Sequence, residues 1–87
     1  MQQDYVEAVK WYTLAAAQGE ASSQYSLGLM YYEGNGVQND LCIAHMCFNL
    51  AAAQGNKDAA HNRDLVEAKM TEQQIAEAQK LARDMLG

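Results

Sequence analysis

The chain carries the same sequence motif twice, at a spacing of 36 residues. Residues 4–19 align without gaps on residues 40–55, and eight of the sixteen aligned positions are identical. Each copy starts with an aspartate and ends with Leu-Ala-Ala-Ala-Gln-Gly. Similarity at a fixed period of this size is typical of solenoids, in which each helix pair buries its apolar face against its neighbours. The repeat therefore constrains the chain to a stack of similar helical units.

Helix-start and helix-stop residues divide the 87-residue chain into about five helices within one domain. Asp4 can cap the first helix, and Gly19 can end it in a left-handed conformation. Thr71 and Gln74 have the spacing of a capping box and open the last helix, which we expect to cap the stack at its C-terminal end. The predicted all-α domain consists of a half repeat at 4–19, a full repeat at 20–55, a degenerate repeat helix at 56–70 and the capping helix at 71–86.

Composition excludes two classes of partner. The net charge is −5, and the six Lys and Arg residues are scattered along the chain. No basic stripe can therefore follow a phosphate backbone, so we expect no nucleic-acid partner. No stretch approaches the roughly 20 apolar residues that a membrane span requires. The first residues contain no secretory signal, and the compartment stays open because we expect the chain to be a piece of a longer protein.

The spacing of particular residues resembles the Sel-1-like repeat family. The pattern combines a helix ending in Leu-Gly-x-x-Tyr, a Gly-x-Gly-Val loop, an Asp, and a second helix with Ala, an aromatic pair and paired Ala. Departures from it are Ser23 for Ala, Cys47 for Trp and Gln38 for Pro. The tetratricopeptide repeat is the alternative, but it has a period of 34 residues and lacks the glycine loop. The matching structural positions are Ala8, Trp11, Tyr12, Gly19, Leu27, Gly28, Tyr31, Gly34, Gly36, Asp40, Ala44, Phe48 and Gly55.

The resemblance implies a right-handed α/α superhelix of stacked antiparallel helix pairs that serves as a non-enzymatic scaffold for protein or peptide partners. We expect this chain to form the C-terminal part of a longer solenoid and to present a groove. The alternative is a structural cap that has no ligand of its own. Because fold alone does not fix function, the two hypotheses need separate tests.

Three residues of the 21–33 helix are candidate partner contacts. Tyr25, Leu29 and Tyr32 point away from the predicted inward stripe, and the resemblance implies that such helices line the concave surface. Aromatic residues are enriched at interfaces. The alternative is that Tyr25 packs on the adjacent repeat. Cys42 and Met46 fall on the outer arc of the 40–54 helix, where they would form an exposed apolar arc.

The cysteines and histidines do not form a recognisable site. Cys42, His45, Cys47 and His61 lack the Cys-x-x-Cys spacing of zinc sites, and no motif supplies an orienting group or an oxyanion hole. We therefore expect packing cysteines, no metal, no cofactor and no catalysis.

The first helix lacks a preceding partner helix in this sequence. Its face with Tyr5, Trp11 and Tyr12 would then self-associate or bind an upstream repeat of a longer protein. We also expect Trp11 to remain structurally important through burial.

Overall fold

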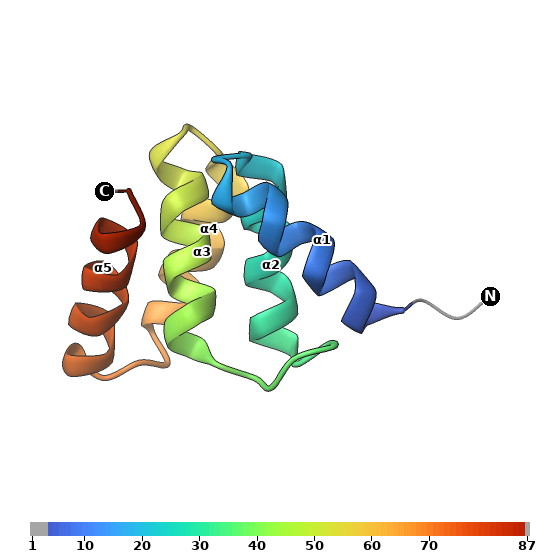
Figure 1. Ribbon diagram of the computed structural model, residues 1–87. Coiled ribbons are helices and arrows are strands. Elements are labelled where there is room, and N and C mark those ends of the chain that lie inside the picture. Colours follow the sequence, from blue (N-terminus) through green and yellow to red (C-terminus); the bar gives the residue numbers. More distant parts are fainter. Residues whose placement is uncertain (1–3, 87) are drawn as a thin grey trace.

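Five helices make up the computed structural model, which describes residues 4–86, with side chains as far as Asp84 (Figure 1). The described residues contain no strand, and the prediction of an all-α chain with about five helices is confirmed. The elements are α1 (Tyr5–Ala17), α2 (Ala21–Glu33), α3 (Leu41–Ala53), α4 (Lys57–Glu67) and α5 (Glu72–Leu86).

The helix starts follow the capping residues in the sequence. Side-chain oxygens of Asp4, Asp40 and Asn56 each accept a hydrogen bond from the backbone N–H three residues later, at 3.1, 3.1 and 2.9 Å. At α5 the capping box is complete: the Gln74 N–H donates to Thr71 Oγ1 at 3.1 Å, and the Thr71 N–H donates to Gln74 Oε1 at 3.0 Å. These bonds satisfy donors that a helix start would otherwise leave unpaired.

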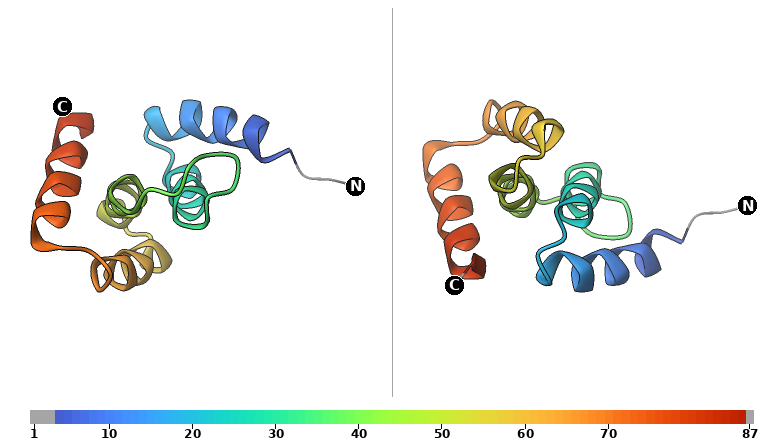
Figure 2. Two further views of the ribbon diagram at one scale, coloured as in Figure 1. Left: turned by 90° about the horizontal axis from the view of Figure 1, so that it is seen from below. Right: turned by 90° about the horizontal axis from the view of Figure 1, so that it is seen from above.

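The helices form a solenoid built around the antiparallel pair α2 and α3. Figure 2 shows these two helices nearly end-on, with α1 running across α2 and with α4 and α5 on other sides of the pair. Backbone contacts join α1 to α2, α2 to α3, and α3 to both α4 and α5. The last helix thus packs on α3 rather than pairing with α4, and it covers a face of α3.

Helices α2 and α3 approach each other closely at Gly28. A Cβ atom added there would lie 2.6 Å from Cε1 of Phe48, which is far inside van der Waals contact. Phe48 is almost completely buried, so an added Cβ would push its ring out of its place in the core. Two buried clusters surround this contact: Ala44, Phe48, Ala51, Ala59 and Val66 on the side of α4, and Ala16, Leu27 and Cys47 on the side of α1.

The loop between α2 and α3 is fixed against the first turn of α1. Gly36 has a φ of +77°, in the left-handed region that favours glycine, and an added Cβ would lie 2.5 Å from the carbonyl carbon and oxygen of Tyr5. Two separate features therefore require glycine at the second position of the Gly-x-Gly loop: the positive φ of the backbone, and the close approach of the loop to the backbone of Tyr5.

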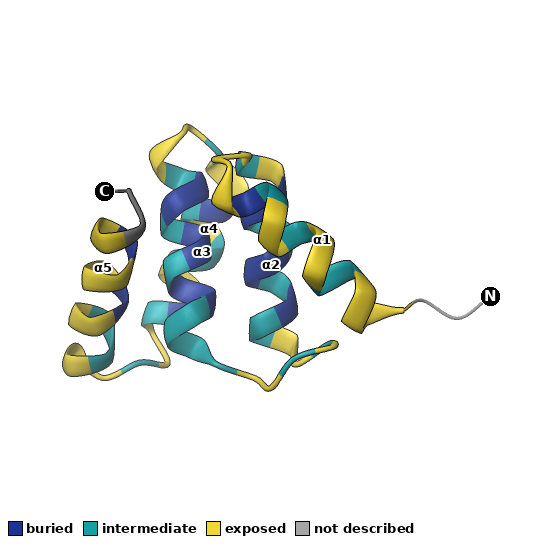
Figure 3. Cartoon of the chain, in the orientation of Figure 1, coloured by how far each residue is buried: buried dark blue, intermediate teal, exposed yellow. Residues whose placement is uncertain are grey.

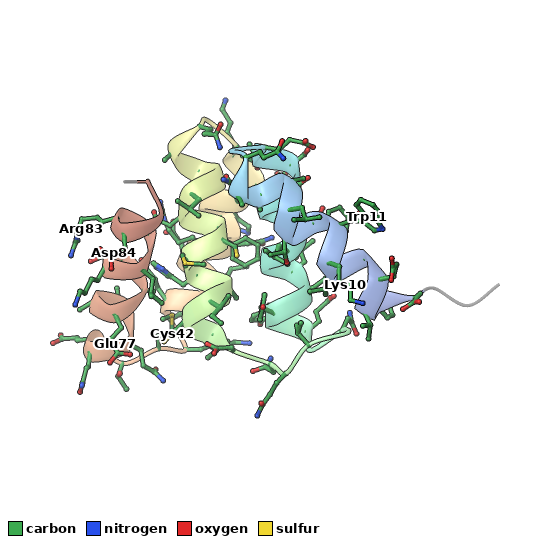
Figure 4. The ribbon with its side chains drawn as sticks, viewed as in Figure 1. Lys10, Trp11, Cys42, Glu77, Arg83 and Asp84 are labelled. Atoms are coloured by element: carbon green, nitrogen blue, oxygen red, sulfur yellow. The ribbon has the colours of Figure 1, made fainter. Side chains whose placement is uncertain are left out.

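Trp11 is not buried, contrary to the expectation from sequence. Its side chain is 65% exposed and points away from the other helices (Figure 4). The equivalent position in the second copy is Cys47, which is 2% exposed because α1 and α2 cover it. The described residues place no helix on the corresponding side of α1, and Figure 3 shows this helix largely exposed. Burial at this position thus depends on a neighbouring helix rather than on the residue.

The exposed apolar arc predicted at Cys42 and Met46 is also wrong. The α5 helix packs against this side of α3, where the Cys42 thiol donates to the Gln74 carbonyl at 3.7 Å, and Ala78 and Ala82 of α5 are buried. Met46 is partly buried against the Cys47 cluster. Helix α5 therefore covers the apolar surface at Cys42, and Met46 packs against the Cys47 cluster instead of forming an exposed arc.

The contrast between Trp11 and Phe48 gives a stability prediction. Truncating a buried Phe leaves a cavity, so Phe48→Ala should lower the free energy of unfolding by about 3 to 5 kcal/mol. Trp11→Ala should lower it by less than about 1 kcal/mol, because the side chain already lies in solvent. Urea unfolding followed by circular dichroism measures both. Equal costs for the two substitutions would contradict the burial pattern described here.

Candidate functional site: the groove between α2 and α4

Tyr25, Leu29 and Tyr32 lie together along the side of α2 that faces α4. Their i, i+4, i+7 spacing places them on one face of the helix, and all three are half-buried rather than fully exposed. Each packs against the cluster around Phe48. Leu29 and Tyr32 form the α2 wall of a hollow whose opposite wall is α4, whereas Tyr25 lies outside its lining.

Tyr25 is held in place by contacts to both neighbouring helices. Its hydroxyl accepts a hydrogen bond from Asn62 Nδ2 of α4 at 3.1 Å, and its ring lies 5.8 Å from that of Phe48, tilted by 50°. Tilted aromatic pairs at this distance are favourable. The contacts match the alternative stated from sequence, in which Tyr25 packs on the adjacent repeat.

Tyr32 is joined to the residues that follow α4. The Lys69 ammonium donates to the Tyr32 hydroxyl at 2.5 Å, and the same nitrogen lies 5.0 Å from the centre of the Tyr32 ring. These two distances place the ammonium beyond the hydroxyl and close to the ring plane, so the contact is a hydrogen bond. The pair links the end of α2 to the turn after α4.

An apolar hollow lies between these walls. Its volume is about 110 Å³, and Phe48 and Val66, both nearly inaccessible to solvent, lie at its buried side. Leu65 of α4 is 51% exposed, which is unusual for a large apolar side chain beside a cavity. Glu33 is the charged residue of the lining. The full lining consists of Leu29, Tyr32, Glu33, Phe48, Asn62, Leu65 and Val66.

A second hollow, of about 220 Å³, follows the seam between α1 and α3. No charged residue lines it, and the amide of Gln24 is already bonded to the Ala16 carbonyl and to the side chain of Gln54, at 3.1 and 2.9 Å. The lining residues are Thr13, Ala16, Ala17, Gln24, Leu27, Tyr31, Ile43, Met46, Cys47 and Leu50.

A buried histidine connects α3 to α4. His45 is fully buried, and its Nε2 lies 2.7 Å from Oε1 of Glu67, while its Nδ1 has no hydrogen-bond partner. The sequence prediction did not identify this pair. The available signal was the alignment of His45 with Val9, which replaces an apolar residue of one copy by a polar residue in the other.

The thiols are poorly suited to nucleophilic chemistry. Burial raises the pKa of Cys47 to about 12. Burial and then the nearby charges of Asp40 and Glu77 raise the pKa of Cys42. Because the thiolate is the reactive form, both residues stay protonated and unreactive near neutral pH. Within residues 4–86, no three potential ligands are grouped to hold a metal, and no helix is long and apolar enough to cross a membrane.

Comparisons with known proteins agree with this architecture. The family model described as the Sel1 repeat matches residues 1–20 and 21–56. The chain is 43% identical over 56 residues to "DAP3-binding cell death enhancer 1" of Rattus norvegicus and, equally, of Mus musculus. These matches cover 64% of this chain but only 11% of each rodent protein.

A solved structure matches nearly the whole chain. The crystal structure of c5321, a protective antigen of uropathogenic Escherichia coli strains that displays an SLR fold, superposes with a TM-score of 0.94 at 32% identity. The match covers 99% of this chain and 19% of the c5321 chain. Sel1 repeats generally mediate protein interactions and are generally non-enzymatic. This chain belongs to the Sel1 repeat family.

Proposed function

We propose that this chain is a non-enzymatic interaction module whose groove between α2 and α4 binds a segment of a protein partner. The observation that carries the proposal is the hollow between Leu29 and Leu65, where an apolar cavity opens beside a half-exposed leucine. Binding sites are typically concave and mostly apolar with a few polar groups at the edge. A side chain of the partner would fill the hollow and cover Leu65.

The relatives support a binding role without identifying the partner. The name of the rodent proteins records a binding partner, DAP3. The chain spans about a tenth of those proteins, so their partner is not carried over to it. What the family contributes to the proposal is the class of function, which is recognition of proteins.

A structural cap is the second candidate function. The α5 helix buries Ala78 and Ala82 against α3 and exposes most of its other described residues to solvent. Terminal units with a polar outer face keep solenoids soluble. In this alternative the hollow between α2 and α4 is only a packing defect, and the chain captures nothing.

Affinity capture from a lysate distinguishes the two functions. Leu65→Ala removes a half-exposed side chain from the groove, whereas Leu81→Ala removes a 41% exposed leucine from α5. Losing an interface contact of about 1 to 2 kcal/mol weakens binding roughly five- to thirtyfold. We expect proteins captured by the wild type and by Leu81→Ala to be lost with Leu65→Ala. No capture at all would favour the cap, whereas equal capture by both variants would show that the chain binds proteins through a surface other than the groove.

We also propose that the open face of α1 binds a second copy of this chain. Trp11 and Leu14 are exposed. The equivalent residues in the second copy of the motif, Cys47 and Leu50, are buried. A second molecule would cover the same positions on α1. Exposed apolar residues that cluster on one helix face often mark interfaces.

Sedimentation velocity tests this contact. The wild type should show a concentration-dependent shift towards a dimer at high micromolar concentration, and Trp11→Ser should shift the protein back to monomer. Leu81→Ser, which changes an exposed leucine on α5, serves as the control and should behave like the wild type. A wild-type protein that stays monomeric throughout this range would contradict self-association.

A further inference from the structure

We infer that the groove between α2 and α4 prefers a peptide in which a large apolar side chain is flanked by lysine or arginine. The inference rests on the proposed function of the groove and adds the chemistry of its partner. It depends on two features of the groove: the size of its apolar hollow, and the exposed carboxylate of Glu33, the charged residue of the lining.

The hollow has the size of one side chain. Its volume is about 110 Å³, and an engineered cavity of about 150 Å³ lined by similar apolar residues binds benzene. A leucine, a methionine or part of an aromatic ring would occupy this space. The groove therefore accommodates a single anchoring residue and not a whole amphipathic helix face.

The inner part of the hollow offers little to a polar side chain. Phe48 and Val66 contribute only apolar atoms there, and both are buried. Asn62, also in the lining, uses one N–H to bond the Tyr25 hydroxyl and keeps its second N–H as a donor. A polar group that entered beside Phe48 and Val66 would lose its bonds to water without replacing them there, and this desolvation cost favours an apolar anchor.

The charged residue of the lining is Glu33, and its carboxylate is accessible. Glu33 is exposed, and its Oε1 accepts a hydrogen bond from Asn35 Nδ2 at 3.0 Å. Within the described part of the chain, no cationic side chain forms an ion pair with Glu33. Lys69 donates to the neutral Tyr32 hydroxyl and keeps its positive charge, but it does not belong to the lining.

The Glu33 carboxylate favours a cation next to the anchor. An ammonium or guanidinium group beside the anchor can approach this carboxylate, and the net charge of −5 attracts cationic peptides at longer range. A carboxylate at the same position would be repelled by Glu33. One exposed ion pair changes affinity by a factor of only about 1.5 to 5, and salt weakens it.

The test uses four short synthetic peptides on a Gly/Ser background. Three carry a central leucine flanked by lysines, glutamines or glutamates, and the fourth carries a central alanine flanked by lysines. Each is titrated into ¹⁵N-labelled protein, and binding is followed at the amide resonances of Leu29, Tyr32 and Leu65. Titrations at about 0.01 M and about 0.15 M salt separate the electrostatic part from the apolar part.

We expect affinity at low salt to decrease a few-fold from the lysine to the glutamine peptide and again to the glutamate peptide. The differences should shrink at the higher salt concentration. Glu33→Gln should abolish the charge preference, and Glu77→Gln, which removes the same charge from α5, should retain it (Figure 4). The alanine peptide should bind at least severalfold more weakly than the leucine peptide with the same lysines.

Each contrary result overturns a defined part of the inference. If the three leucine peptides bind the groove equally, the charge preference is wrong but the groove still binds peptides. If Glu77→Gln abolishes the charge preference as Glu33→Gln does, the net charge of the protein and not Glu33 causes that preference. If the alanine peptide binds as tightly as the leucine peptide with the same lysines, the assignment of an apolar anchor is wrong. If no peptide shifts the three resonances, the inference and the proposed function of the groove both fail.

Discussion

The contact between the Phe48 ring and the backbone of Gly28 is the constraint on which the rest of this molecule depends. Without a side chain at Gly28, α2 and α3 approach closely enough for the ring to occupy the space of the missing Cβ. The ring then contributes to the main buried cluster, packs at a tilt against Tyr25 and lines the hollow beside α4. Core packing and the proposed binding surface therefore share one residue.

Local structure could be predicted from the sequence, whereas burial at the ends of the stack could not. Asp4, Asp40 and Thr71 identify helix starts because capping involves only residues three apart. Trp11 and Cys47 occupy equivalent positions of the two copies, but Trp11 is exposed and Cys47 is buried. The difference arises because burial depends on the neighbouring helices. The same reason explains Cys42, whose surroundings depend on where α5 packs.

The candidate site was predictable on one side only. The spacing of Tyr25, Leu29 and Tyr32 places them on one face of α2, and the structure brings them together there. Their partners Asn62, Leu65 and Lys69 belong to or follow α4, the segment that has lost most of the repeat pattern. No alignment within the chain could therefore reveal which side chains complete the groove, or that His45 would pair with Glu67.

The most direct measurement for this account is the stability of Gly28→Ala. In an unconstrained helix interior, replacing Gly by Ala stabilises by about 1 kcal/mol. Here the added methyl would press against the buried ring, and such overpacking costs about 1 to 3 kcal/mol. The account predicts that urea unfolding shows a net loss of stability, while Ser22→Ala, on the exposed side of the same helix, shows none. A Gly28→Ala protein about 1 kcal/mol more stable than the wild type would contradict the central role of this contact.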